Sequence, residues 1–191
     1  MKVLFLGEIY NPVYEWLIKN GESVFCYNKK FNLDFIRKNK FDFLISYGYR
    51  YIISEDVLLF FKEKAINLHI SLLPYNRGSD PNFWSFLEKS PKGVTIHLIH
   101  KGLDTGDILV QKEIKINSKK HSLKTSYDLL KSEIENLFFK NWNSIKNQKI
   151  IPKKQKGKGS FHLKKDIQKY NYLIQKNGWD TMCNKIEKKE I

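Results

Sequence analysis

Short apolar runs alternate with segments of helical spacing through the first 70 residues, and this alternation constrains the fold more than any other feature of the chain. Apolar runs of four to six residues are typical of buried strands, whereas apolar residues spaced three and four apart are typical of helices. The predicted elements are strand 2–6, helix 12–20, strand 23–27, helix 33–39, strand 41–46, helix 54–61 and strand 65–70. Strands that alternate with helices indicate a parallel sheet covered on both faces. We therefore expect an α/β fold with a Rossmann-like, doubly wound, mostly parallel sheet.

Prolines interrupt this pattern after residue 70, and the elements that follow are less regular. Pro74, Pro81 and Pro91 separate a long loop, a short helix and a turn. Further along, the predicted elements are helix 82–87, strands 93–100 and 108–116, the long helix 122–146, a lysine-rich hairpin or loop at 149–165, and a last helix at 166–177. The sequence indicates one main domain followed by a short C-terminal extension.

The charge distribution bears on which partners this chain can have. The formal net charge is +14, and nearly all of the excess follows residue 110. Such an excess is compatible with a solvated surface or with an anionic ligand. Only Arg37, Arg50 and Arg77 are arginines, and specific recognition of base edges depends strongly on arginine. Nucleic acid is therefore not an expected partner.

Several common classes of protein lose support because their motifs are missing. The first strand is followed by GEIYNP, without the GxGxxG of dinucleotide-binding folds, and the P-loop pattern GxxxxGK[ST] does not occur. Cys26 and Cys183 lie far apart, which argues against a zinc ribbon or a disulfide scaffold. His97 and His100 would point to opposite faces of a strand, a poor geometry for one metal. With no apolar run long enough for a membrane span or a signal peptide, a cytoplasmic protein is expected.

Two polar side chains share one face of the strand predicted at 65–70. Because side chains alternate along a strand, Asn67 and His69 lie on one face and their apolar neighbours lie on the other. Open parallel sheets bind ligands at the carboxyl ends of their strands. A half-exposed edge strand whose polar face meets water would give the same pattern. Spacing alone leaves both interpretations open.

Two longer motifs resemble a known family. The segment NLHISLLPYNRG begins at Asn67, and GVTIHLIHKGLDTGDI begins at Gly93; both are similar to the catalytic core of the folate-dependent formyltransferases. This family includes methionyl-tRNA formyltransferase, glycinamide ribonucleotide formyltransferase and the short nucleotide-linked amino-sugar N-formyltransferases. Looser similarity over LISYGYRYIISEDVL and MKVLFLG extends the resemblance to about two thirds of the chain. It implies a catalytic domain at 1–148 and a lysine-rich extension at 149–191.

The resemblance implies that Asn67, His69 and Asp104 are the catalytic residues. In the implied reaction an unprotonated amine attacks the formyl carbon of the co-substrate N10-formyltetrahydrofolate, and the oxyanion of the tetrahedral intermediate needs hydrogen-bond donors. The Asn67 amide and a protonated His69 are the implied donors. Asp104 would favour the charged form of His69 and accept the proton of the amine. This chemistry requires no metal.

The resemblance also suggests which residues contact the two substrates. The pterin of the cofactor is expected to meet mainly backbone groups of two loops. The implied cofactor contacts are Tyr47, Gly48, Tyr49, Arg50, Tyr51, Ile52, His100, Lys101, Gly102 and Leu103. Arg77 is the candidate for holding substrate or phosphate, with a loop-stabilising ion pair as the alternative. The implied substrate contacts are Arg77, Gly78, Asp80, Asn82 and Trp84.

The loop after Gly78 favours one class of acceptor. It reads SDPNFWSFL where the tRNA enzyme typically has an Ala-Ala-Pro-Ile pattern, and a chain of 191 residues is expected to lack the additional C-terminal domain of that enzyme. The expected substrate is the free amine of a 4-amino-4,6-dideoxyhexose linked to dTDP or UDP, used for bacterial surface glycans such as O-antigen, with a 3-amino sugar as the alternative. Its diphosphate suits a basic surface.

Other hypotheses stay open from the sequence. The same chemistry on glycinamide ribonucleotide or initiator methionyl-tRNA is the first alternative, and a basic, non-catalytic nucleic-acid-binding module is the second. A hydrolase that only deformylates the cofactor would use similar machinery. The sequence leaves open whether the chain forms a homodimer.

Overall fold

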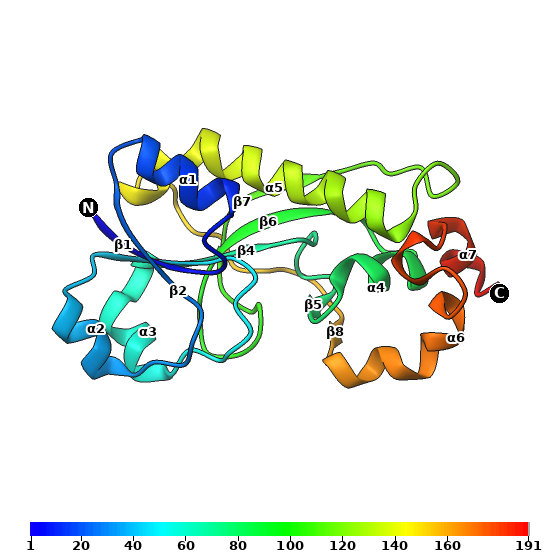
Figure 1. Ribbon diagram of the computed structural model, residues 1–191, viewed down its shortest axis with the longest axis horizontal. Helices are drawn as coiled ribbons and strands as arrows, with labels where there is room; N and C mark the ends of the chain where they lie inside the picture. The colour runs from blue at the N-terminus through cyan, green and yellow to red at the C-terminus, as the bar shows by residue number, and fades with distance from the viewer. Residues whose placement is uncertain (191) are drawn as a thin grey trace. The chain divides into compact units, whose positions relative to one another are not determined.

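A six-stranded, mostly parallel sheet organises the computed structural model, which describes residues 1–190 (Figure 1). The pairs β1–β2, β1–β3 and β3–β4 are parallel. The strands, in the spatial order of the sheet, are β2 (Ser23–Tyr27), β1 (Lys2–Leu6), β3 (Phe43–Ser46), β4 (Ala65–His69), β6 (Gly93–Leu98) and β7 (Ile108–Glu113). The order runs from β1 to β2 in one direction and from β1 through β3 to β4 in the other. The predicted doubly wound α/β fold is confirmed.

The first helices begin and end close to where the sequence predicts. Asn11 and Asn32 precede α1 and α2, and their side-chain oxygens accept hydrogen bonds from Val13 N–H (2.9 Å) and Phe35 N–H (3.1 Å). These contacts satisfy backbone donors that have no partner inside the helix. The main helices are α1 (Pro12–Lys19), α2 (Leu33–Asn39), α3 (Glu55–Phe61), α4 (Pro81–Leu87) and α5 (Leu123–Lys146), and the 3-10 turn η1 (Lys62–Lys64) follows α3.

The chain divides into two compact units that do not follow chain order. The first unit comprises Met1–His69, Ile96–Val110 and Glu135–Lys154. The second comprises Ile70–Thr95, Gln111–Ile134 and, among the described residues, 155–190. The predicted boundary after residue 148 stays a prediction, and Ile191 of the predicted extension lies outside the described residues.

Both faces of the sheet in the first unit are apolar, which explains why its strands read as continuous apolar runs. On one face, Leu4 and Leu6 pack in a cluster with residues of α2 and α3. On the other face, Phe43 meets Trp142 of α5 edge to face, with ring centroids 5.1 Å apart. Figure 1 shows α2 and α3 on one side of these strands, and α1 with the end of α5 on the other.

The buried carboxylate of Glu22 links the N-terminus of the chain to helix α5. Glu22, 6% exposed, accepts hydrogen bonds from the N-terminal ammonium of Met1 (2.9 Å), Trp142 Nε1 (3.0 Å) and Lys146 Nζ (2.7 Å). Burial by itself would raise the pKa of Glu22, but the donors, led by Lys146, lower this pKa from 4.5 to about 2. Because the pKa is depressed in the folded state, the stabilisation is present above pH 4.5 and is lost as the pH falls towards 2.

Glu22→Gln is therefore expected to lower the free energy of unfolding at pH 7 by about 3 kcal/mol. The variant keeps the volume of the side chain but removes the charge that the two ammonium groups face. Denaturant titrations at pH 7 and at steps below pH 4.5 measure the effect, and the difference from wild type should shrink as the pH falls. Glu15→Gln, at an exposed site on α1, is the matched control. Equal unfolding free energies for Glu22→Gln and wild type at pH 7 would contradict the assignment.

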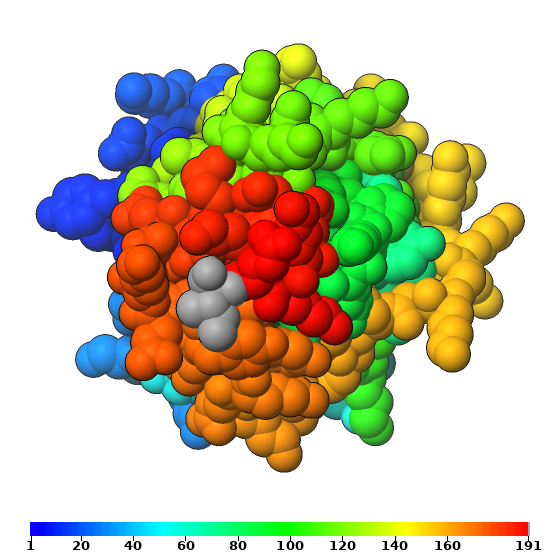
Figure 2. Space-filling model, turned by 90° about the vertical axis from the view of Figure 1, so that its right-hand side faces the viewer, coloured from blue at the N-terminus to red at the C-terminus, as the bar shows by residue number. Residues whose placement is uncertain are grey.

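The second unit packs around a separate apolar cluster that contains Phe83, Phe86, Leu123 and Ile186. A two-stranded parallel ladder joins Arg77–Gly78 to Phe161–His162. Figure 2 shows the C-terminal segment of this unit, orange to red, on the molecular surface. The remaining elements are β5 (Arg77–Gly78), β8 (Phe161–His162), η2 (Lys164–Tyr170), α6 (Asn171–Ile174), η3 (Gly178–Asp180) and α7 (Cys183–Lys188).

The prediction of a single helix at 166–177 is wrong. A 3-10 helix and one α-helical turn occupy this segment instead. Among residues 164–177 only Leu173 is buried, so little apolar contact is present to hold a regular helix. The sequence prediction also missed α7, a six-residue helix anchored by Cys183 and Ile186.

The described part of the chain offers no candidate for a membrane span, because none of its helices is both long and apolar enough. Cys26 and Cys183 are both free thiols.

Candidate active site

The strand β4 carries the two polar residues that the sequence singled out. It lies between β3 and β6, so the alternative of a half-exposed edge strand is wrong. Asn67 and His69 occupy the carboxyl-terminal end of β4, and both side chains reach the same carboxylate, that of Asp104. The period of two along a strand therefore predicted their shared face correctly.

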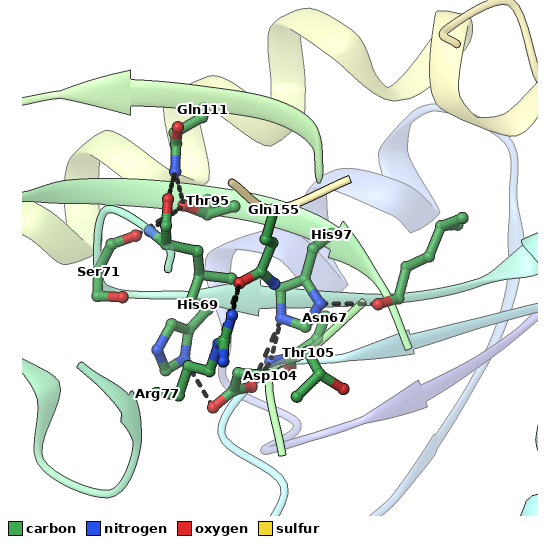
Figure 3. A network of polar contacts seen from close by, with 12 residues as sticks. Asn67, His69, Ser71, Arg77, Thr95, His97, Asp104, Thr105, Gln111 and Gln155 are labelled. Atoms are coloured by element: carbon green, nitrogen blue, oxygen red, sulfur yellow. Dashed lines mark hydrogen bonds and ion pairs between the residues drawn. The ribbon is translucent and has the colours of Figure 1, made fainter. Parts of the chain in front are cut away.

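Asp104 is the centre of the polar cluster in Figure 3. The Asn67 Nδ2 group donates to Asp104 Oδ1 over 3.1 Å, and His69 Nδ1 lies 3.5 Å from Asp104 Oδ2. The His69 side chain is 8% exposed and the Asp104 side chain 13% exposed, so these contacts are largely shielded from water. Charged and hydrogen-bonding groups interact more strongly in such a setting than at the surface.

His97, which the sequence analysis considered only as a metal ligand together with His100, joins this cluster. Its Nδ1 lies 2.7 Å from the carbonyl oxygen of Leu98, which can only accept, so Nδ1 carries a proton. Its Nε2 lies 3.3 Å from Asn67 Nδ2 and 3.5 Å from Asp104 Oδ1. The two N–H groups of Asn67 are thus directed at Asp104 and His97. This contact arises because β6 lies next to β4 in the sheet, a neighbour relation that no local sequence pattern reveals.

A tight turn at 101–107 brings Asp104 to β4. The backbone of Asp104 is left-handed (φ 51°), a conformation that aspartate tolerates better than most residues and that often marks functional sites. Thr105 Oγ1 donates to the carbonyl of Lys101 (3.0 Å) and closes the turn. Gly106 is required here, because a Cβ would collide with the carbonyl oxygen of Leu98.

A cavity of about 380 Å³ opens beside the cluster in the first unit. It lies at the carboxyl ends of β3 and β4, where parallel sheets bind ligands. Its lining includes Asn67, His97 and Asp104 of the polar cluster. The other lining residues are Ser46, Tyr49, Tyr51, Ile52, Ile53, Ser54, Glu55, Leu58, Ile99, His100, Lys101, Gly102 and Leu103.

Seven of the ten predicted cofactor contacts line this cavity. They are Tyr49, Tyr51, Ile52, His100, Lys101, Gly102 and Leu103. Of the others, Tyr47 is buried and donates its hydroxyl to Glu135 Oε1 (3.1 Å), while Gly48 and Arg50 are exposed. The sequence analysis did not select Ile53, Ser54, Glu55 and Leu58, which also line the cavity. Their contact with the cavity depends on how α3 packs under the loop, which no local pattern reveals.

Tyr49 forms part of the cavity wall as a neutral phenol. Its hydroxyl donates to the carbonyl of Lys29 (2.8 Å). Burial, assisted by the neighbouring Tyr51 and Tyr27, raises the pKa of Tyr49 to about 12. The ring therefore presents an uncharged aromatic surface at any physiological pH.

The predicted substrate contacts lie in the second unit. Arg77 donates through Nε (3.0 Å) and Nη2 (2.7 Å) to Gln155 Oε1, a neutral partner, and within residues 1–190 it forms no ion pair (Figure 3). Gly78 is left-handed (φ 89°) and packs against His162. Asn82 donates to the carbonyl of Leu123 (2.9 Å), and Trp84, 3% exposed, stacks on His162. Asp80 precedes α4 with a left-handed backbone.

Comparison with known proteins places this chain among its relatives. The family model described as formyl transferase matches residues 23–140. Methionyl-tRNA formyltransferase of Thermodesulfovibrio yellowstonii is 36% identical over 168 residues, which cover 84% of this chain and 52% of that enzyme. The chain spans about half the length of the curated relatives that it matches.

Solved structures agree with the family model. The formyltransferase PseJ from Anoxybacillus kamchatkensis, in complex with UDP-4,6-dideoxy-4-formamido-L-AltNAc and tetrahydrofolate, is 47% identical with a TM-score of 0.92 over 97% of both chains. A 4-N formyltransferase from Francisella tularensis shares the fold at 22% identity, with a TM-score of 0.75 over 97% of this chain and 85% of that one. The match of the family model and the likeness to PseJ show that this chain belongs to the formyl transferase family.

Proposed function

We propose that this chain transfers a formyl group from N10-formyltetrahydrofolate to the 4-amino group of a UDP-linked 4-amino-4,6-dideoxy sugar. The observation that carries the proposal is the likeness to PseJ, at 47% identity over 97% of both chains. PseJ is described in complex with a UDP-linked 4-formamido sugar and tetrahydrofolate. Removing the formyl group from that sugar leaves a 4-amine, the acceptor that we assign to this chain.

The cavity of the first unit fits the ring system of a folate. A volume of about 380 Å³ lies within the range of small-molecule sites, and Tyr49, Tyr51 and Ile99 give it flat or apolar walls. Residues 101–104 line the cavity, and we assign their backbone groups to the donors and acceptors of the pterin edge. When bound, the cofactor supplies a formyl group attached to nitrogen. We assign Tyr49, Tyr51 and residues 100–103 to holding it.

Asp104 is positioned to take a proton from the attacking amine. An amine that adds to a carbonyl carbon becomes an ammonium and must lose a proton before the carbon–nitrogen bond to the leaving group breaks. The carboxylate of Asp104 lines the cavity, and Asn67 donates to one of its oxygens at 3.1 Å. The role of Asp104 in our proposal is therefore that of the general base, which takes this proton and passes it, directly or through water, to N10 as the bond between the formyl carbon and N10 breaks and tetrahydrofolate leaves.

His69 supports the negative charge that develops on the formyl oxygen. With Nδ1 3.5 Å from Asp104 Oδ2, a proton on Nδ1 is favoured, and a doubly protonated ring can donate from Nε2 to the oxyanion. Asn67 holds Asp104 and His97 with its two N–H groups. Its predicted donation to the oxyanion requires one of these N–H groups to change partner when the substrates bind. His97 acts through Asn67 and is a positioning residue.

A panel of acceptors tests the proposal. Formyl transfer is assayed with UDP-4-amino-4,6-dideoxy-L-AltNAc, a dTDP-linked 4-amino-4,6-dideoxyhexose, glycinamide ribonucleotide and initiator methionyl-tRNA, by tetrahydrofolate release and product mass. We expect kcat/KM for the UDP-linked sugar to exceed that of each other acceptor by at least ~100-fold, because a site built for one set of polar groups rejects ligands that leave them unpaired. The already formylated UDP sugar, which has no free amine, is the control.

The outcomes separate the remaining alternatives. A preference for glycinamide ribonucleotide or for the tRNA would overturn the choice of acceptor while keeping the chemistry. Inertness of the whole panel, together with salt-sensitive binding to unrelated duplexes, would favour a nucleic-acid-binding module instead.

A further inference from the structure

The segment from Lys149 to Lys158, here called the lysine segment, concentrates positive charge on the surface. Five of its ten residues are lysines, at positions 149, 153, 154, 156 and 158. Neither aspartate nor glutamate occurs between Asn136 and Lys165, so no acidic residue close in sequence neutralises them. Figure 2 shows this part of the chain, yellow to orange, projecting from the molecular surface.

The five ammonium groups of the lysine segment have no carboxylate partner in the part of the chain that the structure describes. All five lysines are exposed, and none of them takes part in an ion pair with another residue of 1–190. Lys146, just before the segment, differs because its ammonium group lies 2.7 Å from Glu22 Oε1. Ten consecutive residues span at most about 35 Å, so the five charges stay close together. Like charges at this density attract an anionic surface.

An exposed apolar side chain stands among these lysines. Ile151 is 82% exposed, although isoleucine is one of the residue types most often buried. One exposed isoleucine needs no explanation by itself. Flanked by lysines on both sides, however, it completes the composition of segments that lie at a bilayer interface. In such segments the cations meet the headgroups and the apolar side chain enters the boundary of the acyl chains.

Two backbone hydrogen bonds attach the lysine segment to the sheet. Ile108 N–H donates to the carbonyl of Lys153 (2.8 Å), and Lys153 N–H donates to the carbonyl of Ile108 (2.9 Å). Ile108 is the first residue of the edge strand β7. This attachment uses no lysine side chain. The ammonium groups therefore remain available to a partner, and replacing the side chains leaves the attachment in place.

The composition of the segment favours a lipid surface over nucleic acid. From Asn143 to Ser160 the sequence contains no arginine and no aromatic residue. Proteins that bind single strands stack the bases on aromatic rings, and readout of base edges depends on arginine. A lipid surface requires neither, because its headgroups act on a protein as a field of negative charge. The acyl boundary also accommodates Ile151, whereas a nucleic acid offers this side chain no apolar partner.

We propose that the lysine segment binds the surface of an anionic phospholipid bilayer. The ammonium groups lie at the headgroups, and Ile151 lies at the boundary of the acyl chains. Binding of this kind is peripheral and reversible, and salt weakens it. It uses no residue of the polar cluster or of the cofactor cavity, so it is independent of the proposed formyl transfer.

Co-sedimentation of the full chain with vesicles tests the proposal. Wild-type protein should bind vesicles made of equal parts phosphatidylcholine and phosphatidylglycerol, should bind vesicles of phosphatidylcholine alone much less, and should be released by added salt. Each lysine close to an anionic bilayer contributes roughly fivefold to partitioning. Replacing all five should therefore lower the partition coefficient by at least ~30-fold. This segment variant combines Lys149→Gln, Lys153→Gln, Lys154→Gln, Lys156→Gln and Lys158→Gln.

Ile151 is tested separately from the charges. Ile151→Ser should lower the partition coefficient by at least ~3-fold, because it removes the side chain that enters the acyl boundary. Ile151→Leu, which keeps the apolar volume, should partition like wild type.

A matched variant separates the lysine segment from the net charge of the chain. It replaces five exposed lysines elsewhere and has the same net charge as the segment variant: Lys19→Gln, Lys38→Gln, Lys64→Gln, Lys115→Gln and Lys119→Gln. Its partition coefficient should stay within ~3-fold of wild type. Thermal unfolding and circular dichroism should show that every variant is folded.

Three results would overturn the proposal. The first is wild-type protein that does not bind anionic vesicles at low salt. The second is an equal loss of binding in the segment variant and the matched variant, which would assign the effect to net charge alone. The third is a smaller dissociation constant for an unrelated duplex than for the vesicles, with the duplex lost in the segment variant, which would assign the segment to nucleic acid.

Discussion

Asp104→Asn is expected to lower turnover by at least ~100-fold. Asparagine keeps the size of the side chain and, like aspartate, tolerates the left-handed backbone of this position, so the turn should survive. It cannot accept the proton of the attacking amine. It would also offer an N–H group either to Asn67 Nδ2 or to His69 Nδ1, where the carboxylate now faces both. Steady-state rates with the UDP-linked 4-amino sugar measure the effect.

The expected change lies in kcat and not in binding. KM values for both substrates should stay within ~3-fold, because the proton transfer occurs only in the reaction. Asp34→Asn, at an exposed site on α2, controls for the loss of one carboxylate elsewhere in the first unit. A turnover of Asp104→Asn close to that of wild type would exclude Asp104 as the general base.

His69→Asn is the second substitution with a large expected effect, again at least ~100-fold on turnover. The variant loses a donor that can become positively charged, and the developing oxyanion then depends on neutral groups. Removal of one such donor from comparable sites costs roughly 100- to 1000-fold in rate. His69 is 6% exposed at the end of β4, and asparagine is smaller and polar, so the strand should accept it.

Two further measurements isolate the role of His69. His121→Asn, which replaces a histidine outside the polar cluster, should retain the wild-type rate. Thermal unfolding should show that His69→Asn remains folded. If the folded variant keeps more than about a tenth of the wild-type turnover, His69 does not stabilise the oxyanion to the extent proposed.

The fold of the first 70 residues could be predicted because each of its elements carries its own local signal. Apolar runs mark the strands that are covered on both faces, and apolar residues at helical spacing mark the helices between them. The C-terminal segment lacks such signals. Between 164 and 177 only Leu173 is buried, and a single anchor does not fix the length or type of a helix.

The residues of the candidate site could likewise be predicted only in part. Asn67 and His69 follow from the two-residue period of one strand, a purely local property. Asp104 lies far along the chain, and only the family resemblance connected it with them. His97 was missed because its spacing from His100 was considered only for a shared metal, whereas its actual contacts, Asn67 and Asp104, arise from the pairing of β6 beside β4.

The fate of a labelled formyl carbon tests the central claim most directly. N10-formyltetrahydrofolate labelled in the formyl group is mixed with the chain and UDP-4-amino-4,6-dideoxy-L-AltNAc, and the label is followed in sugar and in formate. We predict that the label appears in an amide on the sugar in step with tetrahydrofolate release, and that Asp104→Asn suppresses both. Label recovered as formate at the same rate with and without the sugar would contradict formyl transfer and identify a hydrolase.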